Sequence, residues 1–238
     1  MRRTLAVAAA ISVCTLTTAP AGAAPRTTKG AGITTKGTGW NLTSRLGVTG
    51  LSPSRPYTVT FATAAMKARY TPYLTAAVAQ AQAAGVKLAL GGVETVNPAK
   101  CGPVGHVQIT EMYRPLQKPG YSQGMPCPHP PKGVGTGGIA AIDSEYFDGS
   151  YRIDTYVVRN TVVHEMLHAL GLDHPNVDLD KDGVVENSEC VATSYGNKPI
   201  MCDPNGGYRT TTNVGKLTGF DVNGLKALLA NSRAQGVK

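Results

Sequence analysis

The chain has 238 residues, of which 42% are hydrophobic and 16% charged, and it carries a net charge of +8 at pH 7. This length allows one domain with a sizeable core and at most a small satellite. Lysines and arginines are scattered singly without interleaved aromatic residues, which argues against a nucleic-acid-binding surface.

Residues 1–24 have the three parts of a secretory signal peptide. Two arginines precede an apolar stretch over 5–16, and Ala-Gly-Ala follows at 21–23 as a cleavage site. The apolar stretch is too short for a spanning helix, so we expect a secreted, extracellular protein without stable membrane insertion. Lipidation at Cys14 is the alternative, and the bulky valine before that cysteine argues against it.

Residues 25–55 are rich in Thr, Gly, Ser, Lys and Arg, and they predict a flexible leader or a short pro-segment. The single tryptophan, Trp40, lies in this stretch. We expect the folded domain to occupy residues 56–235.

The elements expected in this domain follow from hydrophobic periodicity and from turn residues. Thr71 as N-cap and Pro72 at the first helical position set the start of the first helix. The predicted elements are strands from Tyr57 to Ala64, over 86–93, over 105–113 and over 137–143, helices over 71–84, 154–170 and 218–232, and a Pro- and Gly-rich loop over 114–136.

The predicted helix over 154–170 carries the chemistry of the chain. His164 and His168 are four residues apart, so both imidazoles project from one face of the helix. Glu165 lies beside this pair, where it can reach a water molecule without binding the metal. Gly171 permits a sharp turn that brings His174 back as a third ligand. Three ligands leave the fourth position of a zinc ion open, which is the arrangement of catalytic zinc.

These five residues match the H-E-x-x-H-x-x-G-x-x-H motif, and the chain resembles the metzincin clan of zinc endopeptidases over roughly residues 55–232. Met201, in "PIMCDP", resembles the methionine turn that lies beneath the zinc in this clan. Within the clan the chain is most similar to matrixin-type peptidases, whereas Pro175 after the third histidine is similar to serralysins. The tyrosine that serralysins place two residues after the turn methionine is replaced by Asp203.

The resemblance implies an α+β or α/β zincin fold with a twisted mixed sheet, two or three main helices, and a zinc cleft between an N-terminal α/β subdomain and a loop-rich C-terminal subdomain. It implies a secreted, monomeric zinc endopeptidase in which Glu165 is the general base for a zinc-activated water. A peptide or protein substrate would pair with the strand over 137–143, taken as an edge strand. The alternatives are a calcium-stabilised extracellular binding protein without catalysis on the same fold, and a hydrolase with a different target.

A second motif lies between His174 and Met201. Residues 178–189 match all fixed positions of an EF-hand calcium loop, D-x-[DN]-x-[DN]-G-x5-E. No long amphipathic helices flank it, so we expect an isolated calcium loop with a structural role. The predicted ligands are Asp178, Asp180, Asp182, the carbonyl of Val184, Glu186 and Glu189.

Four cysteines remain after removal of the signal peptide, and an exported chain with this number suggests two disulfides. Three connectivities are open, and we favour the pairing of neighbours in the sequence over the other two and over free thiols. The favoured pairs are Cys101 with Cys127 and Cys190 with Cys202.

Overall fold

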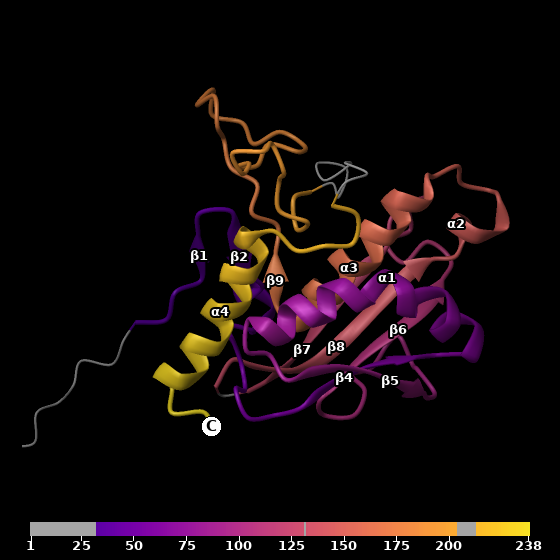
Figure 1. The fold of residues 1–238 in the computed structure, drawn as a ribbon, viewed down its shortest axis with the longest axis horizontal. Coiled ribbons are helices and arrows are strands. Elements are labelled where there is room, and N and C mark those ends of the chain that lie inside the picture. Colours follow the sequence, from indigo (N-terminus) through magenta and orange to yellow (C-terminus); the bar gives the residue numbers. More distant parts are fainter. Residues whose placement is uncertain (1–31, 131, 204–212) are drawn as a thin grey trace, which may run out of the picture.

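The computed structural model describes residues 32–130, 132–203 and 213–238, and Figure 1 shows their arrangement. A mostly parallel sheet is combined with helices, which confirms the expected mixed α and β class. The predicted signal peptide over 1–24 lies outside the described residues.

The main sheet has six strands, ordered β3, β8, β6, β4 and β5, with β7 also paired to β8. All described pairs are parallel except that of β7 with β8. The sheet is therefore mixed, as predicted. The bounds are β3 (Gly50–Leu51), β4 (Tyr57–Phe61), β5 (Leu88–Val93), β6 (His106–Met112), β7 (Gln123–His129) and β8 (Val134–Asp143).

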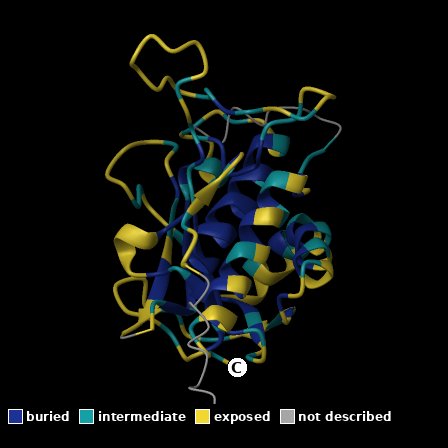
Figure 2. Ribbon diagram, turned by 90° about the vertical axis from the view of Figure 1, so that its left-hand side faces the viewer, coloured by how far each residue is buried: buried dark blue, intermediate teal, exposed yellow. Residues whose placement is uncertain are grey.

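Two long helices, α1 and α3, cover one face of this sheet, and α4 packs beside them (Figure 1). Strand side chains that face the helices, such as Val59, Ile109 and Ile142, are fully buried because neighbouring residues in a strand point to opposite faces. In Figure 2, much of the central strands and of the helices packed on them is dark blue, the colour of buried residues. The helices are α1 (Ala64–Ala83), α2 (Glu145–Asp148), α3 (Thr155–Leu170) and α4 (Gly219–Ala234), with a 3-10 turn η1 (Ser44–Leu46).

The edge strand next to α3 differs from the prediction. Residues 137–143 belong to β8, which lies inside the sheet between β6 and β7, so their assignment as the edge strand is wrong. The edge is β7, within the stretch predicted as a loop over 114–136. Its prolines, Pro126 and Pro128, argue against a strand, but an edge strand with an irregular register at those residues tolerates them.

Helix α1 starts earlier than predicted. Thr63 is its N-cap and accepts a hydrogen bond from Met66 N at 3.1 Å, so Pro72 lies inside the helix. The helix is anchored before Pro72 by Tyr70, which is fully buried and donates its hydroxyl to Glu111 at 2.7 Å. Tertiary packing thus outweighs the backbone hydrogen bond that proline removes.

Part of the segment predicted as a flexible leader or a short pro-segment, residues 25–55, forms strands that pair with the rest of the chain. Strands β1 (Lys36–Gly37) and β2 (Trp40–Leu42) form a small antiparallel sheet with β9 (Leu172–Asp173). Thr43 N also donates to Gly171 O at 2.9 Å. This segment therefore supports the turn that follows α3.

Trp40 is half-buried against the hydrophobic core. We expect Trp40→Ala to lower the free energy of unfolding by about 2 kcal/mol, roughly half the cost of emptying a fully buried aromatic site. Denaturant unfolding followed by far-UV circular dichroism measures this change, and Trp40→Phe should lose less than half as much. An unchanged midpoint for Trp40→Ala would mean that the segment is a detachable leader.

Candidate metal centre

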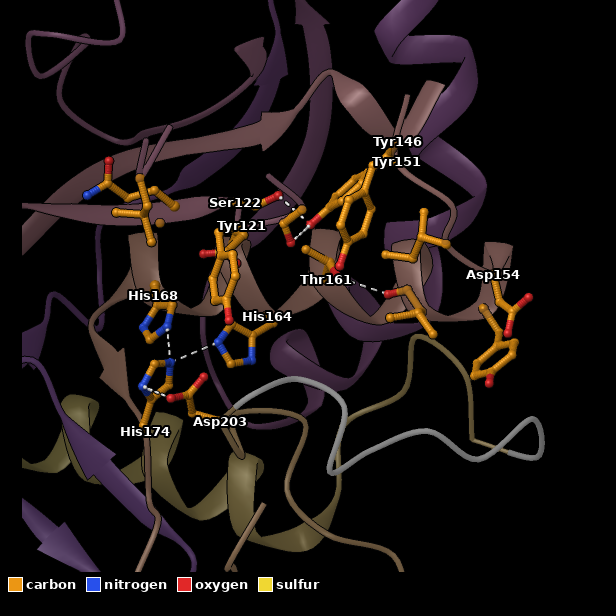
Figure 3. A pocket seen from close by; sticks show the side chains of 18 of the residues that line it. Tyr121, Ser122, Tyr146, Tyr151, Asp154, Thr161, His164, His168, His174 and Asp203 are labelled. Carbon is orange, nitrogen blue, oxygen red and sulfur yellow. Dashed lines mark hydrogen bonds and ion pairs between the residues drawn. The ribbon is translucent and has the colours of Figure 1, made fainter. Parts of the chain in front are cut away.

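The three histidines predicted as ligands converge in space. His164 and His168 lie one turn apart on α3, and both are buried. Gly171 ends the helix with φ of +110°, a left-handed conformation that favours glycine. The chain then turns through β9 and brings the ring of His174 toward the other two (Figure 3). The three residues form a group that could hold a metal ion.

The ring atoms that face one another are the Nε2 atoms. His174 Nε2 lies 3.1 Å from His164 Nε2 and 2.9 Å from His168 Nε2. On the other side of each helical ring, Nδ1 is paired with a backbone carbonyl: His164 with Ile200 O at 2.7 Å, and His168 with Leu172 O at 2.8 Å. A carbonyl only accepts, so both Nδ1 atoms carry the proton and both Nε2 atoms present lone pairs.

A single proton on His174 Nε2 could not bond well to both lone pairs, whereas a cation can be bound by all three nitrogens. Burial, followed by the mutual repulsion of the charged rings, lowers the pKa of His164 well below its ordinary value and that of His168 to about 3. Both helical rings are therefore neutral at physiological pH, the form that metal ligation needs.

Glu165 follows the first histidine and is buried at the same site, with 6% of its surface exposed. Burial raises the pKa of this carboxyl to about 8, although a hydrogen bond from the Gly124 backbone opposes the shift. Gly124 belongs to β7 and packs directly under α3, where an added Cβ would collide with the backbone of Glu165 and with His168 Cβ. The close approach of β7 to α3 thus depends on the absence of a Cβ at Gly124.

The predicted methionine turn lies behind His164. Ile200 O accepts from the ring of this histidine, and Met201 is buried in the core. Both residues are fixed to α4, because the Asp221 carboxylate accepts from Ile200 N at 3.1 Å and from Met201 N at 3.3 Å. Asp221 also accepts from the N–H and the hydroxyl of Thr218, the N-cap of α4.

A cavity of about 470 Å³ opens beside the histidines. Residues 121–125, which lead into β7, form one wall, and residues along α3 as far as His168 form another. Aromatic side chains line the part away from the histidines (Figure 3). They include Tyr146 and Tyr151, and Tyr156 also lines the cavity. Among the described strands β7 pairs only with β8, so the cleft lies along an unpaired strand edge.

The predicted calcium loop is an exposed turn in which carboxylates accept backbone N–H groups. Asp178 accepts from Lys181 and Gly183, and Glu189 accepts from Leu179, Asp180 and Glu186. Gly183 has φ of +94°, the conformation that the sharp turn at this position requires. The predicted acidic ligands fall into two groups that could hold a cation: Asp178, Asp180 and Glu189, and Asp180, Asp182 and Glu186.

Both predicted disulfides are confirmed. Cys101 pairs with Cys127, which ties the loop before β6 to β7. Cys190 pairs with Cys202, which joins the residue after the predicted calcium loop to the residue after Met201.

Sequence reasoning assigned no role to Gly124 or Asp203, although both lie at the site. Asp203 lines the cleft, and its carboxylate lies 3.7 Å from His174 Nδ1. The only sequence signal for Asp203 was its place where serralysins have tyrosine. No local pattern distinguishes Gly124 from the other glycines of its loop.

None of the described helices is long and apolar enough to cross a membrane. No protein-family model matches the chain, and a search of curated proteins finds no match either.

Proposed function

We propose that the chain is a secreted zinc-dependent endopeptidase of the metzincin type. The observation that carries this proposal is the convergence of three imidazole Nε2 atoms beside a buried carboxylate, in a cleft that follows an unpaired strand edge. Two disulfides are consistent with the oxidising extracellular compartment.

The ligand set suits zinc. Bonds of about 2.0–2.1 Å in a tetrahedral arrangement separate two ligand nitrogens by roughly 3.3 Å. The separations of 3.1 and 2.9 Å between Nε2 atoms are close to this value. When bound, zinc would polarise a peptide carbonyl and lower the pKa of a water molecule to about 7.

Glu165 supplies the proton transfers. Its carboxyl lies in the cleft, and burial raises its pKa to about 8 in the metal-free protein, close enough to physiological pH for it both to accept and to return a proton. In peptide hydrolysis it takes the proton of the attacking water and delivers it to the leaving amine. His164 and His168 cannot take this role, because their Nδ1 protons point to backbone carbonyls and their Nε2 lone pairs would be taken up by the ion.

The substrate backbone would pair with the outer edge of β7. An extended peptide added to an unpaired strand gains main-chain hydrogen bonds that do not depend on its sequence. Residues 121–125 lie along the cleft on the side facing Glu165, so such a peptide passes the carboxylate. Binding by the strand edge therefore favours extended polypeptides as substrates.

Casein and gelatin hydrolysis by the purified protein tests this function. We expect cleavage that a chelator stops, that added Zn²⁺ restores, and that Glu165→Ala lacks. Zinc-loaded native protein as inert as Glu165→Ala would contradict the proposal and favour a binding protein without catalysis.

We also propose that the loop over 178–189 binds calcium and orders the segment between His174 and Met201. Extracellular calcium loops bind at about 10⁻⁴–10⁻³ M, so 10 mM Ca²⁺ should raise the melting temperature by roughly 3–10 °C. Asp178→Ala should lose this increment, whereas Asp148→Ala, which removes an exposed carboxylate elsewhere, should keep it. Equal increments in the two variants would contradict the site.

A further inference from the structure

The third histidine is held differently from the other two. His164 and His168 are buried on a rigid helix, whereas 37% of the His174 side chain is exposed and its residue lies outside regular structure, after β9. The backbone of His174 is fixed, because its N–H donates to Asp173 Oδ1 at 2.8 Å and its carbonyl accepts from Asn41 Nδ2 at 3.4 Å. Neither contact sets the rotation of the ring.

The group that faces the outer nitrogen of this ring is Asp203. Its Oδ2 atom lies 3.7 Å from His174 Nδ1, and Figure 3 shows the carboxylate beside the ring. Shortening this contact by about 1 Å gives a charge-assisted hydrogen bond. With the Nδ1 proton directed to Asp203, His174 presents its Nε2 lone pair to the centre, as the other two histidines do.

Asp203 is fixed to the chain next to His174 by a reciprocal pair of hydrogen bonds. Asn176 Nδ2 donates to Asp203 O at 2.6 Å, and Asp203 N donates to Asn176 Oδ1 at 2.9 Å. Ser188 N also donates to Asp203 O at 2.7 Å, and the preceding residue, Cys202, is disulfide-bonded. The side chain of Asp203 is therefore exposed, but its backbone is fixed by three hydrogen bonds.

We propose that Asp203 is a positioning residue that orients the imidazole of His174 for metal binding, and that the side-chain amide of Asn176 holds Asp203 in place. The inference rests on the proposed zinc site. Outer partners of metal-binding histidines fix the tautomer and the ring orientation, and their loss costs 10- to 100-fold in metal affinity. His174 gains most from such a partner because its ring has no helix to hold it.

Zinc affinity, measured by competition with a chromophoric chelator on the full secreted protein, tests the proposal. We expect Asp203→Ala to weaken zinc binding at least 10-fold, and Asp203→Asn, which keeps an oxygen acceptor, to weaken it less. Asn176→Ala should fall between the native protein and Asp203→Ala. Asp154→Ala is the charge control, because Asp154 lines the same cleft at the far end of α3, and it should bind zinc within 2-fold of the native protein.

A second measurement reads the ring directly. Long-range ¹H–¹⁵N spectra of the zinc-loaded protein should assign the proton of His174 to Nδ1, and Asp203→Ala should shift or broaden this signal while those of His164 and His168 stay unchanged. Native zinc affinity in Asp203→Ala would overturn the proposal. An equal loss of zinc affinity in Asp203→Asn or in Asp154→Ala would also overturn it, because the loss would then come from the removed negative charge and not from a hydrogen bond to His174. If the native protein binds no zinc, the proposed function itself fails. If the native protein shows chelator-sensitive proteolysis and Asp203→Ala binds zinc as tightly as the native protein, only this inference fails.

Discussion

Glu165→Gln should lower kcat for peptide hydrolysis at least 100-fold while zinc content and KM stay close to those of the native protein. A positioned general acid–base group contributes about 10²–10⁴ to the rate, and the amide cannot accept the proton of water. The substitution keeps the shape of the side chain and leaves the three histidines untouched. Steady-state kinetics on a fluorogenic peptide, with zinc measured by atomic absorption, separates these quantities.

The same variant should not unfold more easily. The pKa of Glu165 in the folded, metal-free protein is about 8, above its ordinary value of 4.5, so the folded state holds a proton that the unfolded state releases. The native state therefore loses stability as pH rises from 4.5 to 8, and an uncharged glutamine avoids that loss. Thermal melts at pH 7.5, after metal removal with a chelator, should give Glu165→Gln a melting temperature equal to or above that of the native protein.

Glu111→Gln is the matched control for activity. Glu111 accepts hydrogen bonds from Tyr70 and Arg69 of α1 and does not line the cleft, so its amide variant should keep nearly native kcat. Activity above one tenth of the native value in zinc-loaded Glu165→Gln would remove Glu165 as the proton carrier. Equal losses in both glutamine variants would point to a general defect of folding.

The part of the candidate metal centre that could be predicted from the sequence depends on short-range geometry. A spacing of four residues places His164 and His168 on one face of any α-helix, whatever packs around it. Gly171 ends that helix in the left-handed conformation that the sequence predicted, and His174 follows only three positions later. The disulfide pairs also join cysteines that are 26 and 12 residues apart, close neighbours in the chain.

The parts that the sequence missed depend on contacts between distant residues. Strand β7 contains two prolines, and only its position beside β8 and α3 makes it a strand. The segment around Trp40 is polar and rich in glycine, and it is ordered by pairing with β9, more than 120 residues later. Asp203 and Asn176 are 27 residues apart, and neither stands in a motif that predicts their reciprocal hydrogen bonds.

Gly124→Ala should reduce both stability and activity strongly. Its Cβ would lie 2.5 Å from His168 Cβ and even closer to Glu165 O, and backbone atoms cannot rotate away. Overpacking of this kind costs about 1–3 kcal/mol, which corresponds to a fall in melting temperature of roughly 3–10 °C. Because α3 must move away from β7, Glu165 and His168 shift together, and a displacement of about 1 Å can cost 100-fold in rate.

Gly92→Ala separates this collision from the general effect of adding a methyl group to a strand. Gly92 lies in β5 of the same sheet, and nothing lies within 4 Å of an added Cβ there. Thermal melting and kcat/KM of Gly92→Ala should both stay close to native values. If Gly124→Ala melts at the same temperature as Gly92→Ala and cleaves at the native rate, then α3 and β7 are not in close contact at this glycine, and the strand edge does not position Glu165. If Gly124→Ala stays folded and keeps zinc but loses activity, the close contact of β7 with α3 mainly positions the Glu165 carboxylate. His164 and His174 can then still hold the ion.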